Sequence, residues 1–282
     1  MLRRLLAPLL LGCFFSTLCA HSGCAVDPRT SAALADALVD GPIRTYASLQ
    51  SDSLAQTCML LQTQAAPEAG GMQDLAAAQG SWLKARAAYD RGVALFLVAA
   101  PELNFDIDGP PDNVLALGGL RQVERLLFTS PAASPTELTA LTLSLRSSAI
   151  KLHLAVADGA PVVAADLVGS MSALASLLAT KIDGSASPYA GAAAAVASAQ
   201  NSLIGLQAMY DVLSPVVQGA DPLLDQQIAT ALRELQEPLR ALPSLELLAD
   251  KPRYLRQCAA LSIALNQLGR ALGFPVTAID LS

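Results

Sequence analysis

The chain has 282 residues, a formal net charge of −6 and 53% apolar residues, of which aromatic side chains are few, at 4% of the chain. Alanine and leucine supply most of the apolar residues, and both favour helices, whereas strands favour β-branched and aromatic residues. No dense stripe of lysine and arginine is present, which excludes a typical nucleic-acid-binding surface. We therefore expect an all-α protein that binds no nucleic acid.

Residues 1–25 have the features of a secretory signal peptide. Arg3 and Arg4 give a basic start, and an apolar stretch without acidic residues follows from Leu5 to Leu18. That stretch is short for a transmembrane helix, but its length suits a signal sequence. The sequence thus predicts export, with residues 26–282 forming the mature domain.

The end of the signal peptide is compatible with two kinds of processing. Ala20 and Ala25 are small residues of the kind found at cleavage sites. Ser22 and Gly23 instead precede Cys24 as in a lipoprotein signal, where the cysteine becomes lipidated. The expected location is therefore the periplasm of a Gram-negative bacterium or, through lipid on Cys24, its outer membrane. A lipid anchor is the only membrane contact that we expect.

Two cysteines remain after the signal peptide, Cys58 and Cys258. An even pair in an oxidising compartment predicts a disulfide. This bridge would close a loop of roughly 200 residues and stabilise the fold by about 3–5 kcal/mol on chain-entropy grounds. The alternative is a pair of free, buried thiols that pack as small apolar side chains.

From Thr30 onward, apolar residues recur at spacings of three and four, as in Leu34, Leu38 and Ile43, which predicts amphipathic helices. The segments between them are rich in Gly, Pro, Asn and Asp, and they fall at residues 67–71, 101–112, 131–135, 158–161, 183–188, 219–222 and 243. Two breaks end in a helix cap followed by proline, at Ser134–Pro135 and Asp221–Pro222. This pattern predicts eight or nine helices and no strand.

A weak internal repeat suggests two similar halves. Residues 119–127 can be aligned with residues 205–213, and in both copies a proline-containing cap and an amphipathic helix follow. Such a repeat predicts two pseudo-symmetric up-down four-helix bundles, at about 28–158 and about 159–275.

One helical segment concentrates chemically distinctive side chains: Trp82, Arg86, Tyr89 and Asp90 lie within about two helical turns. They could form the wall of a cleft that faces residues 121–124. Alternatively, Trp82 and Tyr89 pack in the core while Arg86 and Asp90 pair at its margin, where such a pair contributes only a few tenths of a kcal/mol.

Four segments resemble the imelysin-like family in their order and spacing. Residues 33–61 look like its opening helices, and residues 82–89 look like its W-x-x-A-R-x-x-[WY] helix. Residues 119–127 stand where the family carries G-x-H-x-x-E followed by two leucines, and residues 272–275 resemble its closing segment. The resemblance implies two four-helix bundles, export and a link to iron uptake, with an uptake-system protein or outer-membrane receptor as partner. It also implies a metal site at His-x-x-Glu and, from imelysins themselves, a reported peptidase activity.

This sequence departs from that pattern at the metal motif, because Arg121 takes the place of the histidine. Arginine has no lone pair to offer a metal, so we expect Arg121 to form an ion pair with Glu124, three residues further along the helix. His153 is the only histidine after the signal peptide and has no ligand-like neighbours in the sequence. We therefore expect neither a metal nor a cofactor. A carboxylate-only metal site is the alternative, formed by Asp90, Asp106, Asp108 and Glu124.

Motifs of enzyme chemistry are absent from the sequence. It contains no G-x-S-x-G, H-E-x-x-H, P-loop or Rossmann glycine pattern. The acidic stretch 104–113 lacks the glutamate that ends a calcium-binding EF-hand loop, so we interpret it as an interhelical loop. A binding or accessory protein is expected, with a cleft near Trp82, Arg86, Tyr89, Asp90, Arg121 and Glu124. The rival hypothesis is a metallopeptidase of the imelysin type.

Overall fold

The computed structural model describes residues 28–66, 74–109, 119–129, 135–159, 162–182 and 190–274. These residues form α-helices and two short 3₁₀ turns, without a strand, which confirms the predicted all-α class. The helices are α2 (Pro28–Ala65), α3 (Leu75–Ala99), α4 (Asn104–Asp108), α5 (Gly119–Thr129), α6 (Pro135–Asp158), α7 (Ala164–Thr180), α8 (Ala192–Ala220), α9 (Pro222–Leu239) and α10 (Lys251–Ala271). The 3₁₀ turns are η2 (Pro101–Leu103) and η4 (Leu245–Leu247). The predicted signal peptide and Cys24 lie outside the described residues.

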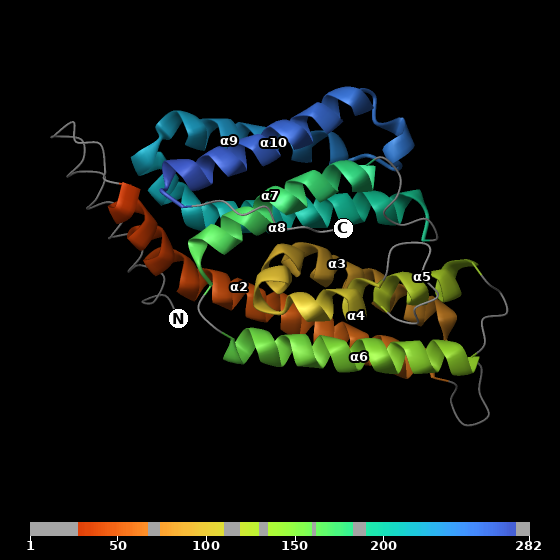
Figure 1. The fold of residues 1–282 in the computed structure, drawn as a ribbon. Helices are drawn as coiled ribbons and strands as arrows, with labels where there is room; N and C mark the ends of the chain where they lie inside the picture. The colour runs from red at the N-terminus through yellow and green to blue at the C-terminus, as the bar shows by residue number, and fades with distance from the viewer. Residues whose placement is uncertain are drawn as a thin grey trace, which may run out of the picture.

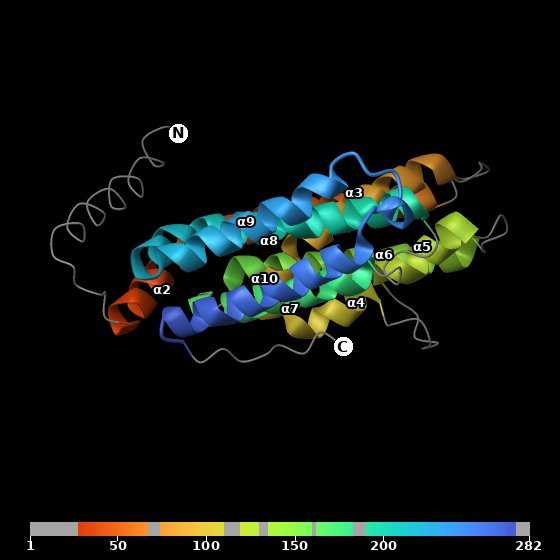
Figure 2. The ribbon, with the colours of Figure 1, turned by 90° about the horizontal axis from the view of Figure 1, so that it is seen from above.

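The helices gather in two groups that share one apolar core (Figure 1). In one group α2 packs against both α3 and α6, and α5 lies against α3 and α6. In the other, α7 packs against α10 and α8 against α9, as the view from above also shows (Figure 2). Helix α3 contacts α7 and α8, so it lies where the two groups meet. Side chains on α3 can therefore reach both groups.

Apolar spacing and caps account for where the helices form. In α2, Val39, Ile43, Leu54 and Leu61 are fully buried on one face, at the spacing that a helix of 3.6 residues per turn requires. The Asp221 side chain accepts hydrogen bonds from the backbone N–H groups of residues 223 and 224 at the start of α9. The predicted cap with proline at the first helical position is thus confirmed there.

A close backbone approach holds α3 against α8. Gly205 faces the carbonyl oxygen of Arg91 so closely that a Cβ at this position would lie 2.3 Å from it. One turn earlier on α8, Asn201 accepts a hydrogen bond of 2.7 Å from Arg91 Nε. These contacts fix the register of α3 and α8 beside Asp90, the residue that precedes Arg91 on α3.

The predicted disulfide is wrong for this structure. Cys58 on α2 and Cys258 on α10 are free thiols, each fully buried. Their helices belong to different groups (Figure 1), and the two thiols form no bridge. Burial raises the pKa of both thiols to about 12. The alternative interpretation, two packed thiols, is the one that the structure has.

None of the described helices is both long and apolar enough to cross a membrane.

Candidate functional site

The distinctive turn of α3 lies in the core. Trp82, Arg86, Tyr89 and Asp90 are all at most 5% exposed. Arg86 donates from Nε and Nη2 to the two carboxylate oxygens of Asp90, at 3.1 and 2.8 Å. The predicted pairing of Arg86 with Asp90 is thus confirmed, but it is buried rather than marginal. A bidentate pair of this kind is stronger and more directional than an exposed one.

A buried lysine reaches the same carboxylate from the other helix group. Lys181 follows the last residue of α7, and its Nζ donates to Asp90 Oδ1 at 2.6 Å. Nζ also contacts the hydroxyl oxygens of Ser198 and Ser202 on α8, at 3.1 and 2.9 Å. All three ammonium protons therefore have acceptors, which a charge at 4% exposure requires.

A second carboxylate continues the network toward the surface. Asp108, the last residue of α4, accepts a hydrogen bond from Arg86 Nη1 through Oδ1. Its Oδ2 accepts from Nε and Nη2 of Arg121 on α5, at 3.2 and 3.1 Å. Charges alternate along the resulting ion network: Lys181, Asp90, Arg86, Asp108 and Arg121.

The predicted ion pair between Arg121 and Glu124 is wrong. Arg121 is directed to Asp108, whereas Glu124 Oε1 accepts a hydrogen bond of 2.9 Å from the backbone N–H of Ala190. Glu124 is 1% exposed, while the Arg121 side chain is 27% exposed. Spacing along α5 could not reveal this, because the partners of both residues lie on segments that are distant in sequence.

The two aromatic residues attach α5 and α4 to α3. The indole N–H of Trp82 donates to the Leu120 carbonyl oxygen at 2.8 Å, and its ring meets Phe128 edge to face. The Tyr89 hydroxyl donates to the side-chain oxygen of Asn104, and the Arg86 guanidinium lies 5.3 Å from the centre of the Tyr89 ring. Both rings pack in the core, as the second interpretation of this turn predicted.

Electrostatics keeps both aspartates ionised. Burial alone would raise the pKa of Asp90, but the charges of Arg86 and Lys181 outweigh it and the pKa is lowered. The pKa of Asp108 is lowered as well, because the charges of Arg86 and Arg121 outweigh the effect of burial. Burial lowers the pKa of Lys181, and Asp90 offsets only part of that effect. The network therefore stabilises negative charge on the acids more fully than positive charge on the lysine.

The carboxylates proposed as an alternative metal site do not converge. Asp90 and Asp108 are occupied by cationic side chains, Asp106 is exposed, and Glu124 faces Ala190. Within the described ranges, no three His, Cys, Asp or Glu side chains are placed to hold one ion. The segment that was interpreted as an interhelical loop contains α4, whose Asp108 belongs to the ion network.

Sequence reasoning missed Lys181, Ser198, Ser202 and Asn104. Lys181 directly follows an apolar helix and Ser198 lies in an alanine-rich one, so neither stands in a recognisable motif. His153, interpreted as a packed or surface residue, lies 3.1 Å from the Ser51 hydroxyl and links α6 to α2.

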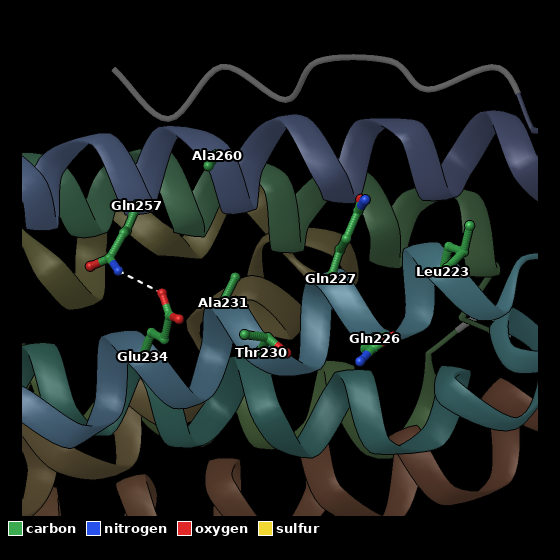
Figure 3. A pocket seen from close by; sticks show the side chains of 8 residues that line it. All are labelled: Leu223, Gln226, Gln227, Thr230, Ala231, Glu234, Gln257 and Ala260. Carbon is green, nitrogen blue, oxygen red and sulfur yellow. Dashed lines mark hydrogen bonds between the residues drawn. The ribbon is translucent and has the colours of Figure 1, made fainter.

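A groove of about 410 Å³ lies elsewhere, between α9 and α10 (Figure 3). It is lined by Leu223, Gln226, Gln227, Thr230, Ala231, Glu234, Gln257 and Ala260. Gln257 donates a hydrogen bond of 2.7 Å to Glu234 across it. The groove is open and none of its residues belongs to the ion network, so the network, with its buried and converging charges, is the better candidate site.

Comparison of the sequence with models of known protein families and with curated proteins gives no match.

Proposed function

We propose that the chain is an exported, imelysin-like binding or accessory protein whose metal motif has been replaced by an internal ion network. The observation that carries the proposal is Asp108, held between the guanidinium groups of Arg86 and Arg121. Two pseudo-symmetric four-helix bundles, one before and one after residue 159, are part of the proposal. The grouping of α2–α6 and of α7–α10 supports it.

The chemistry of the motif position supports a role without a metal. A guanidinium is permanently cationic and cannot coordinate a metal, yet it supplies positive charge where the family's histidine would hold a cation. Arg121 directs that charge to Asp108, and Arg86 engages both Asp108 and Asp90. Each carboxylate in the network thereby has a cationic partner from the protein itself.

Metal analysis of the purified protein tests this proposal. We expect less than stoichiometric zinc, iron or manganese in the wild type after exposure to each metal and removal of the excess. Glu124→Gln is the diagnostic variant, and Glu102→Gln, which changes an exposed acid outside the network, is its control. Stoichiometric metal that is lost in Glu124→Gln and kept in Glu102→Gln would overturn the proposal and favour the metallopeptidase hypothesis.

The proposed location is the periplasm or, through lipid on Cys24, the outer membrane, with an uptake-system protein or receptor as partner. Labelling cells with radioactive palmitate separates the two locations, since label that disappears in Cys24→Ser identifies a lipoprotein. Chemical crosslinking in intact cells, followed by purification, tests for the partner. Recovery of the protein from the cytoplasmic fraction alone would contradict the proposed export.

A further inference from the structure

We infer that Arg86 and Arg121 form a receptor for a carboxylate ligand and that Asp108 is a built-in competitor which occupies it. This inference rests on the proposed binding role and names the chemistry of the ligand. The ligand would be a small carboxylic acid or an acidic side chain of a peptide, because either presents the group that Asp108 presents.

The contacts of Asp108 are those of a bound ligand. Its two oxygens are held by guanidinium groups from different helices, Arg86 on α3 and Arg121 on α5. A planar, permanently charged fork is the side chain best suited to a carboxylate. Arg86 is also fixed in place from behind by its bidentate contact with Asp90, so this half of the receptor is preorganised on the 25-residue helix α3.

The carboxylate that fills the receptor comes from a short element. Helix α4 has five residues, and its other attachments to the fold include buried Ile107 and the contact of Asn104 with Tyr89. Asp90, in contrast, lies in the middle of the 25-residue helix α3 and could not leave without disrupting the core. Of the two acids in the network, Asp108 is the one that can be exchanged.

Arg121 and Asp108 are the part of the network that is nearest to solvent, while Arg86 lies behind them with its side chain 6% exposed. The side chains of Arg121 and Asp108 are 27% and 15% exposed, whereas that of Asp90 is fully buried. The network holds three cations and two acids, so moving Asp108 away would leave two more positive charges than negative ones. An incoming carboxylate restores the original balance, and this exchange therefore conserves the charge of the site.

Acetate binding to the full-length protein tests the inference. Titration calorimetry, with chloride balancing ionic strength, should give a dissociation constant at least about tenfold lower for Asp108→Ala than for the wild type, because the competitor has been removed. Asp40→Ala is the matched control, since Asp40 pairs with Arg44 at the surface. We expect no gain in Asp40→Ala, and loss of the gain in Asp108→Ala/Arg121→Ala.

A second variant leaves every charge in place, in case Asp108→Ala does not fold. Gly119 has φ +79°, and a Cβ there would lie 2.3 Å from the Gly109 backbone nitrogen, so Gly119→Ala should push the end of α4 away from α5. It too should bind acetate more tightly than the wild type. In the wild type itself, saturating acetate should increase hydrogen exchange in residues 101–109. Comparing the affinity for acetate with that for an amidated peptide that contains one aspartate shows whether a small carboxylic acid or an acidic side chain is the preferred ligand.

Equal acetate affinity in the wild type, Asp108→Ala and Gly119→Ala would overturn the inference. It would also be overturned if chloride produced the same binding and the same increase in hydrogen exchange as acetate. That result, together with a metal-free protein, would leave the proposed binding role standing with a different ligand. Stoichiometric metal would instead overturn the proposed function itself. The two failures are therefore distinguishable.

Discussion

Lys181 Nζ and Asp90 Oδ1 lie 2.6 Å apart, although 91 residues separate them in the sequence. The contact joins the end of α7 to the middle of α3 and is buried on both sides. Asp90 accepts from Arg86 as well, so a single carboxylate compensates two buried cations. The network is therefore asymmetric: its acids are scarcer than its bases.

We predict that Asp90→Asn is far more destabilising than Lys181→Met. Removing the Asp90 charge leaves three cations with one acid and should cost about 3–5 kcal/mol, the usual effect of breaking a buried ion pair. Removing Lys181 leaves two cations and two acids. It also removes a charged group that burial disfavours, as the lowered pKa of Lys181 shows. That variant should cost only about 1–2 kcal/mol, for the hydrogen bonds it loses. Urea unfolding at neutral pH measures both values.

Equal losses of unfolding free energy in the two variants would contradict this prediction. They would show that Lys181 and Asp90 stabilise the fold as an isolated pair and that the excess of cations in the network has no effect. Glu102→Gln, at an exposed position, serves as the control and should leave the unfolding midpoint unchanged.

Stability should decrease at acidic pH because of the same two acids. The pKa values of Asp90 and Asp108 are lower in the folded protein than their ordinary value of 3.8. A lowered pKa stabilises the fold fully above the unfolded-state value, and that contribution is lost as the pH falls through the folded-state value. We therefore expect the contribution of these groups to the melting temperature to be constant above about pH 5 and to fall steeply below about pH 4.

Asp108→Asn should weaken this acid dependence, because one of the two groups no longer titrates. Calorimetric melting of the wild type and of this variant over the same pH series measures the difference. Parallel curves for the two proteins would assign the acid sensitivity to other carboxylates.

The helical class was predictable because it depends on local features. Alanine and leucine content, apolar spacing along α2 and the Asp221 cap all act within a few turns of one helix. The pairing of Arg86 with Asp90 was also predictable, since four residues bring two side chains together on any helix.

Contacts between distant segments were not predictable from the same signals. Arg121 has an acid three residues away, yet it pairs with Asp108 because α4 folds back against α5. Lys181 reaches Asp90 only because α7 packs beside α3. The disulfide prediction failed for the same reason, because compartment and cysteine count say nothing about which helices are neighbours.

The contact between α3 and α8 leads to a matched pair of glycine variants. Gly205→Ala should destabilise the protein by about 1–3 kcal/mol, because the added methyl group would press on the Arg91 carbonyl and force α3 and α8 apart. Gly80→Ala, within α3, adds a methyl group with no atom within 4 Å and should stabilise by about 0.5–1 kcal/mol. Opposite signs in urea unfolding are the expected result, and destabilisation by both changes would contradict the assigned packing.

The two buried cysteines should remain unmodified in the native protein. Burial raises the pKa of each thiol to about 12, so at neutral pH almost none is present as the reactive thiolate. We expect iodoacetamide to alkylate Cys58 and Cys258 only after unfolding, and to do so equally with and without a reductant. Peptide mass spectrometry reads out each position separately in the full-length chain. If either cysteine needs reduction before it is alkylated in urea, then it is disulfide-bonded and the prediction is wrong. Because α2 and α10 belong to different helix groups, its bonding partner would then be another cysteine of the chain or a thiol of another molecule.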